Sequence, residues 1–137
     1  MQKQEDEPRG LRAKILLIDG DLFFLKNSGE FLRFAGYDVD ICQNVEEAFL
    51  KIPPAKPDCI ILDAALPGSI DKILPLIRLQ TPEIPLIVFM ESDHPENPVF
   101  HDPGIKKVIR KPFDAFDLYL SIEEALRSKK MGAVDAD

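Results

Sequence analysis

Short, unbroken runs of apolar residues recur along the chain and limit its possible folds more than any other feature. Three runs are strong and a fourth is weaker: 15–18 (Ile-Leu-Leu-Ile), 59–62 (Cys-Ile-Ile-Leu), 86–90 (Leu-Ile-Val-Phe-Met) and 108–109 (Val-Ile). A strand that is covered on both faces has continuous apolar residues, whereas a strand with one wet face alternates. The runs therefore predict central strands of a parallel sheet with helices on both faces.

A fifth strand and the intervening helices complete the pattern. Residues 37–42 alternate between apolar and polar side chains, which is typical of an edge or half-exposed strand. Residues 22–35 have the spacing of one helix face, and Gly36 is placed to end that helix. Strands and helices thus alternate, which predicts an α/β fold: a doubly wound unit of five parallel strands starting near residues 14, 37, 58, 85 and 106.

Helix starts are marked by capping residues. Asn44 and Glu47 have the spacing of a capping box and predict a helix through about residue 50. Ser69 is a candidate cap for the next helix, and Asp114 for the last one. Three prolines between residues 91 and 103 leave little room for a regular helix, so we expect the helix between the last two strands to be short, irregular or missing.

Composition narrows the class of protein. The 137 residues fit one domain, with flexible tails at 1–12 and 129–137 around a folded unit at 13–128. A net charge of -7 argues against direct binding of nucleic acid, and no apolar stretch is long enough for a membrane span. Cys42 and Cys59 lie inside apolar runs, as free thiols do in a reducing cytosol. We therefore expect a cytoplasmic domain.

Charged residues follow three of the predicted strands. Asp19 and Asp63 come directly after apolar runs, with Asp21 close to the first, and Lys111 follows the last strand. In an open parallel sheet, ligands bind beyond the carboxyl ends of the strands. Carboxylates that face a lysine at that edge can hold a divalent cation and accept a phosphoryl group.

An ordered set of motifs resembles the receiver domain of two-component response regulators. The set runs from about residue 13 to residue 128, and only 91–103 is unmatched. Its parts are the first strand with its acidic cluster (14–21), the second strand and helix (36–39 and 44–48), the phosphoacceptor strand with its Pro-Gly loop (57–68), the fourth strand (84–89) and the Lys-Pro turn (111–113).

The resemblance implies a flavodoxin-like fold with strand order 2-1-3-4-5, in a signalling module that is not an enzyme. It implies that Asp63 accepts phosphate from a sensor histidine kinase or phosphotransfer protein, and that Lys111 pairs with the phosphoryl group. Mg²⁺ would be held by Asp19, Asp63 and the backbone carbonyl of Ala65. Asp21 is a further candidate ligand, although acids at a helix start commonly serve the helix dipole instead. The family's Lys-Pro bond is often cis.

Three positions depart from the family pattern. Gly20 stands where the family has a second acid, Met90 replaces a Ser or Thr that bonds the phosphoryl group, and Val108 replaces a switch aromatic. Two hypotheses follow. Either phosphotransfer at Asp63 is retained in weakened form, or the chain is a pseudo-receiver that docks a downstream protein through its fourth-helix and fifth-strand face without phosphorylation.

A third interpretation, an unrelated flavodoxin-like enzyme or nucleotide binder, has less support. The residues after the first strand match neither glycine-rich phosphate-loop pattern.

Overall fold

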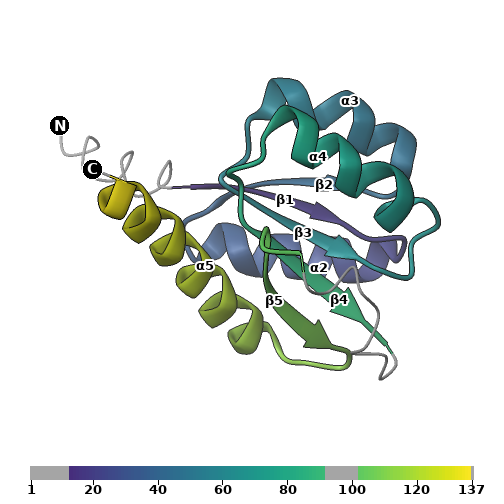
Figure 1. Ribbon diagram of the computed structural model, residues 1–137. Coiled ribbons are helices and arrows are strands. Elements are labelled where there is room, and N and C mark those ends of the chain that lie inside the picture. Colours follow the sequence, from purple (N-terminus) through teal and green to yellow (C-terminus); the bar gives the residue numbers. More distant parts are fainter. Residues whose placement is uncertain (1–12, 92–101, 137) are drawn as a thin grey trace, which may run out of the picture.

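A five-stranded parallel sheet forms the centre of the computed structural model, which describes residues 13–91 and 102–136 (Figure 1). The strand order is β2-β1-β3-β4-β5, so the predicted fold class and order are confirmed. The strands are β1 (Lys14–Ile18), β2 (Asp38–Cys42), β3 (Cys59–Asp63), β4 (Leu86–Met90) and β5 (Ile105–Arg110).

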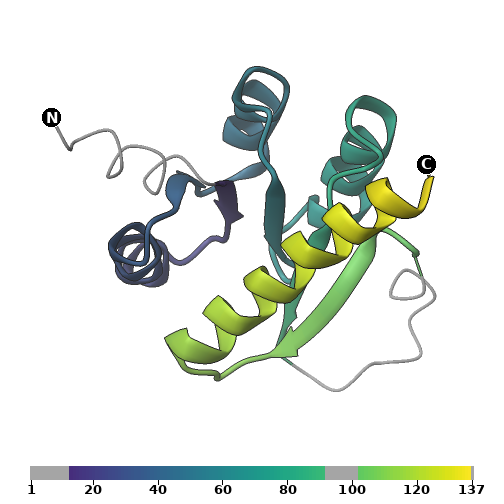
Figure 2. The ribbon, with the colours of Figure 1, turned by 90° about the vertical axis from the view of Figure 1, so that its left-hand side faces the viewer.

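Helices cover both faces of this sheet, as Figures 1 and 2 show from two sides. Those of the described residues are α2 (Leu22–Phe34), α3 (Val45–Ala55), α4 (Leu74–Gln80) with a π-helical turn η1 (Ser69–Ile73) before it, and α5 (Ala115–Ala136). Helices α2 and α5 pack on one face, and α3 and α4 pack on the other. The α5 helix continues into 129–136, the stretch that the sequence assigns to a tail.

Between β4 and β5, the sequence predicts a helix that is short, irregular or missing. The expected short or missing helix falls on residues 92–101, which lie outside the described residues.

Burial explains why the apolar runs became central strands. Every residue of β3 and β4 is buried, whereas the edge strand β2 has two buried residues, Val39 and Cys42, and three half-buried ones. Successive residues of β1 pack into two separate cores on opposite faces of the sheet. Ile15 and Leu17 pack under α2 and α5. Leu16 and Ile18 pack under α3 and α4. One consequence is that the residue after Ile18, which is Asp19, faces the α2 and α5 side.

Capping fixes most of the helix starts as predicted. The Glu47 N–H donates to Asn44 Oδ1 at 2.9 Å, and the Glu47 carboxylate accepts the Gln43 N–H at 2.7 Å. Asp114 caps α5 by accepting the Asp117 N–H at 2.9 Å. The α2 helix ends just before Gly36, whose φ of 107° is readily adopted by glycine.

The cap predicted at Ser69 is wrong. Gly68 holds the N-cap position with a φ of 85°, where a Cβ would lie 2.8 Å from Val45 Cγ2, so the site requires glycine. Ser69 lies one residue inside the turn and is buried, and its hydroxyl donates to the Ala64 carbonyl at 3.2 Å. Because a buried donor needs a hydrogen-bond partner, the Ser69 hydroxyl bonds the nearby Ala64 carbonyl instead of capping the helix.

Adjacent residues at the start of α2 differ in exposure. Phe23 is 77% exposed while its neighbour Phe24 packs against the core, since adjacent helical residues cannot share one face. Cys42 on β2 and Cys59 on β3 are both buried, as their apolar surroundings in the sequence predict, and neither forms a disulfide.

None of the helices within 13–91 and 102–136 is both long enough and apolar enough to cross a membrane.

Candidate functional site

Two carboxylates and one ammonium meet at the carboxyl edge of the sheet. Asp19 follows β1, Asp63 ends β3 and Lys111 follows β5, as parallel strands require. The Lys111 Nζ lies 2.9 Å from Asp19 Oδ2 and 3.9 Å from Asp63 Oδ2. The structure therefore brings together the three charged residues that the sequence singled out, although β1 and β5 are not neighbours in the sheet.

Asp19 is the most enclosed member of the cluster. Its exposed fraction is only 1%, and its Oδ1 accepts the Asp21 N–H at 2.9 Å while Oδ2 accepts from Lys111. Its backbone N–H donates to the Cys42 carbonyl at 3.0 Å, which fixes the turn after β1. Both carboxylate oxygens thus have a donor, as a buried charge requires.

Asp63 is buried with weaker compensation. It is 6% exposed, and its Oδ1 accepts the Ala65 N–H at 3.0 Å. Burial raises the pKa of Asp63 above its ordinary value, and the nearby Asp19 and Glu91 carboxylates act in the same direction, whereas the Ala65 N–H and the Lys111 ammonium oppose them. A buried carboxylate whose pKa is shifted by burial and by specific charged neighbours is typical of a functional site.

Both the backbone and the side-chain ammonium of Lys111 make contacts that fix its position. Its backbone N–H donates to the Met90 carbonyl at 2.8 Å, and the following Lys111–Pro112 peptide bond is cis. Its Nζ lies 4.9 Å from the centroid of the Phe24 ring and 5.5 Å from that of Phe89. The ammonium therefore contacts both carboxylates and aromatic rings.

Asp21 does not join this cluster through its carboxylate. Its Oδ1 accepts the backbone N–H groups of Phe23 and Phe24 at 3.1 and 3.2 Å, so the side chain is the N-cap of α2. Only the Asp21 backbone N–H reaches the site, where it bonds Asp19.

Two of the three positions that depart from the expected pattern lie at the same edge. Gly20 is exposed beside Asp19 and contributes no side chain. Met90 ends β4 and is buried, whereas Val108 lies in the middle of β5 and is 36% exposed. Neither the Met90 thioether nor the Val108 side chain can donate a conventional hydrogen bond to a ligand.

Few side-chain ligands for Mg²⁺ gather at this site. Within the described ranges no group of three or more His, Cys, Asp or Glu side chains gathers to hold a metal ion. A bound Mg²⁺ prefers several oxygen ligands in octahedral geometry. Asp19 and Asp63 both pair with the Lys111 ammonium, so the pocket already contains a cation. The carbonyl of Ala65 belongs to the loop that follows Asp63.

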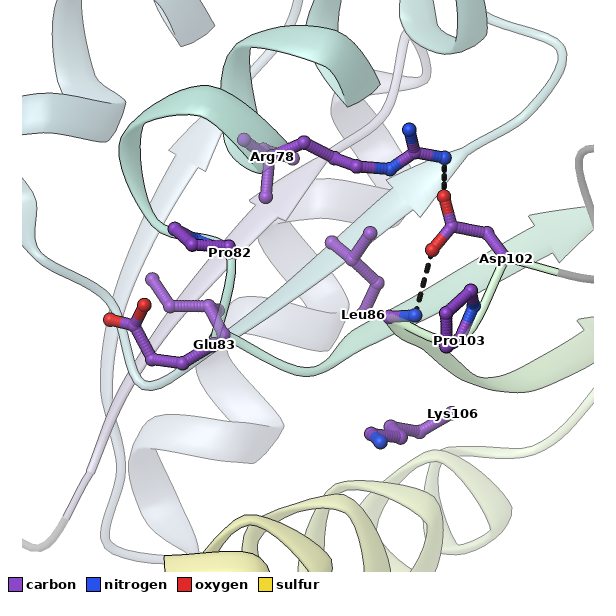
Figure 3. A pocket seen from close by; sticks show the side chains of 10 residues that line it. Arg78, Pro82, Glu83, Leu86, Asp102, Pro103 and Lys106 are labelled. Carbon is purple, nitrogen blue, oxygen red and sulfur yellow. Dashed lines mark hydrogen bonds and ion pairs between the residues drawn. The ribbon is translucent and has the colours of Figure 1, made fainter.

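A separate cavity of about 520 Å³ lies at the other end of the sheet, near the starts of β4 and β5 (Figure 3). Arg78 of α4 points across it and pairs with the Asp102 carboxylate, which also accepts the Gly104 N–H at 2.7 Å. This cavity contains none of the residues that the sequence predicts as functional.

Sequence reasoning missed the part that Phe24 and Phe89 play at the site. Phe89 lies in the core and Phe24 packs against it. Their contact with the Lys111 ammonium brings together α2, β4 and the residue after β5, and no spacing in the sequence encodes it. The only local sign is that Phe24 follows the acidic turn by three residues.

Comparisons with known proteins agree with this geometry. The family model of the response regulator receiver domain matches residues 15–123. The phosphate regulon transcriptional regulatory protein PhoB of Pseudomonas aeruginosa is 29% identical over 126 residues, which cover 89% of this chain and 55% of that protein. The alkaline phosphatase synthesis transcriptional regulatory protein PhoP of Bacillus subtilis is 26% identical over 130 residues, covering 93% and 54%.

A solved structure is similar over nearly its whole length. It is a response regulator receiver domain protein from Methanospirillum hungatei, with a TM-score of 0.79 and 25% identity, and the match covers 88% of this chain and 98% of that one. By contrast, the chain spans about half the length of the curated relatives that it matches.

Proposed function

Because the chain belongs to the response regulator receiver domain family of two-component signalling, we propose that it is a phosphate-accepting signalling domain in which Asp63 is the phosphoacceptor and works in attenuated form. The observation that carries the proposal is the Asp63 carboxylate, buried beside the Lys111 ammonium at the edge where ligands of such sheets bind.

The proposed transfer uses groups of this chain as follows. One Asp63 oxygen attacks the phosphorus of a phosphohistidine in the donor protein, a P–O bond forms, and the P–N bond to the histidine breaks as that nitrogen takes up a proton. Lys111 is close enough to move from Asp19 toward the new phosphoryl oxygens, because its Nζ is only 3.9 Å from Asp63 Oδ2. The donor would be a sensor histidine kinase or a phosphotransfer protein.

Attenuation follows from what surrounds Asp63. Gly20 supplies no second acid for Mg²⁺, Met90 supplies no hydroxyl for the phosphoryl group, and Val108 supplies no aromatic switch. Mg²⁺ would therefore bind weakly or not at all, and the charge of the transferred group would be met chiefly by Lys111.

The test is an amide NMR titration of the whole chain with Mg²⁺ and then with beryllofluoride, a mimic of aspartyl phosphate. At high Mg²⁺ concentration, we expect beryllofluoride to cause saturable shifts at Asp19, Asp63, Ala65 and Lys111 that are absent in Asp63→Asn. Incubation with phosphoramidate followed by intact-mass measurement gives a second readout. No shift and no added phosphoryl mass, under conditions that saturate an ordinary receiver domain, would exclude the proposal.

The alternative is a pseudo-receiver that binds a downstream protein without phosphorylation. The specific observation in its favour is the Lys111–Asp19 ion pair, which closes the acid pocket with the chain's own cation. Its docking face would include β5, where Lys106, Lys107 and Val108 are exposed. A partner affinity that changes severalfold on addition of beryllofluoride would exclude this alternative.

A further inference from the structure

The Lys111 ammonium contacts two aromatic rings as well as the carboxylates. Its Nζ lies over the Phe24 ring at 4.9 Å and over the Phe89 ring at 5.5 Å from the centroids. Both distances are within the range in which a cation is attracted to the face of an aromatic ring. The lysine side chain is only 19% exposed, so these rings replace much of the water that an ammonium would otherwise hold.

The Phe24 ring is fixed in one orientation. It packs edge-to-face on Phe89 and on Phe113, with interplanar angles of 86° and 88°. Its backbone is fixed as well, because the Phe24 N–H donates to the Asp21 cap at the start of α2. The same turn positions Asp19, whose Oδ1 accepts the Asp21 N–H. One local turn therefore sets the positions of both the carboxylate and the ring that contact Lys111.

Phe89 completes the arrangement from the sheet. It is fully buried on β4, and its register partner on β3 is Asp63. The Ala64 N–H donates to the Phe89 carbonyl at 2.9 Å, so the ring and the candidate acceptor are held on adjacent strands. A lysine between these groups has little freedom to leave the pocket.

We propose that Phe24 and Phe89 are positioning residues that hold the Lys111 ammonium against Asp19, so that Lys111 itself is the resident cation of the acid pocket. This inference rests on the proposed function, because a lysine held in this way is in position to pair with a phosphoryl group on Asp63. A divalent cation would have to compete with Lys111 for Asp19.

The experiment observes the lysine directly, in the full chain and without a phosphoryl donor. In a ¹⁵N-lysine sample, we expect the Lys111 Hε and ammonium protons to be shifted upfield by the ring currents of Phe24 and Phe89. Phe24→Leu keeps apolar bulk but removes the ring face, and should abolish most of this shift. It should also speed exchange of the Lys111 ammonium protons with water about threefold to tenfold.

Two variants provide the controls. Phe24→Tyr keeps the ring face and should retain the shift. Phe31→Leu lies on the same helix, is also half-buried against the same core, and should leave the Lys111 signals unchanged. If Phe24→Leu changes the Lys111 signals no more than Phe31→Leu does, the inference is wrong.

Two further measurements separate the possible failures. Contacts between Lys111 Hε and Phe24 ring protons in the unmutated chain test the geometry even if Phe24→Leu does not fold, and their absence overturns the inference. In Asp63→Asn the Lys111 signals should persist, because the primary partner of Lys111 is Asp19. A chain that shows these signals yet takes no phosphoryl group supports the inference and contradicts only the proposed function.

Discussion

The Lys111 ammonium donates to Asp19 Oδ2 at 2.9 Å, although the two residues are 92 positions apart in the sequence. Asp19 is almost completely buried, and within the described part of the chain Lys111 is its one ion-pair partner. The charge of Asp19 is therefore balanced by a single side chain, that of the residue after the last strand.

Loss of that side chain should destabilise the domain. Lys111→Met would leave two buried carboxylates without their cation, and we expect a loss of about 2–4 kcal/mol in the free energy of unfolding at neutral pH. Adding Asp19→Asn should recover much of the loss. Urea unfolding measures both effects. The control is Lys107→Met, which removes an exposed lysine of β5 and should cost less than about 1 kcal/mol. Equal losses in the two lysine variants would contradict the prediction.

Restoring an acid at Gly20 should create metal affinity. The position has room for a side chain, since a Cβ there would lie 3.4 Å from Leu66 Cδ1 and the backbone is outside the left-handed region. Gly20→Asp should therefore increase Mg²⁺ affinity by about tenfold or more, because affinity rises with the number of charged ligands. Gly20→Asn fills similar space without the charge and is the control in the same titration. A Gly20→Asp affinity no higher than that of Gly20→Asn would count against the site geometry.

Variants of Asp21 should separate its capping role from a metal role. Asp21→Ala removes the acceptor for the first N–H groups of α2 and should cost about 1 kcal/mol of stability, whereas Asp21→Ser should retain most of it. Thermal unfolding with and without Mg²⁺ checks both. If Mg²⁺ binding falls equally in the Ala and Ser variants, Asp21 is a ligand rather than only a cap.

The pH dependence of stability should reveal Asp63. Burial raises its pKa in the folded domain above the ordinary value of 3.8, so between these two values the folded state holds more protons than the unfolded state. The stability contributed by this group is therefore fully present at low pH and is lost as pH rises through the raised pKa. Asp63→Asn cannot ionise and should gain stability relative to the unmutated chain across that window.

The measurement is the free energy of unfolding in metal-free buffer from about pH 3.5 to about pH 7. Asp71→Asn removes one exposed carboxylate of η1 and controls for the change in net charge. A stability difference between Asp63→Asn and the unmutated chain that stays constant with pH would contradict the assignment.

Cys42 should be inert to thiol reagents in the folded domain. Burial raises its pKa to about 11, with Lys51 opposing the shift and Glu47 and Asp40 adding to it. Since the thiolate is the reactive form, a disulfide reagent at about pH 8 should modify Cys42 only as fast as the domain opens. Both cysteines should become reactive together in urea. Rapid modification of Cys42 in the folded state would show that β2 opens far more readily than its buried side chains suggest.

Much of the fold could be predicted because each element depends on local patterns. The unbroken apolar run in β3 requires burial on both faces, and the alternation in β2 identifies it as an edge strand. The caps at Asn44 and Asp114 are contacts within one helical turn, so residue spacing alone locates them. Ser69 is not the cap, because its hydroxyl bonds a carbonyl in the loop before the turn. The N-cap is Gly68, since glycine readily adopts the left-handed backbone conformation at that position.

The sequence by itself determined which residues reach the carboxyl edge of the sheet, because strand direction and side-chain alternation place Asp19, Asp63 and Lys111 there. The tertiary structure alone decided how they pair. Lys111 lies closer to Asp19 than to Asp63. Its position in the sequence does not set this preference, which depends on the residues that pack around the ammonium. The Phe24 ring contacts the ammonium from a different element, and such contacts between distant segments depend on how the helices pack on the sheet.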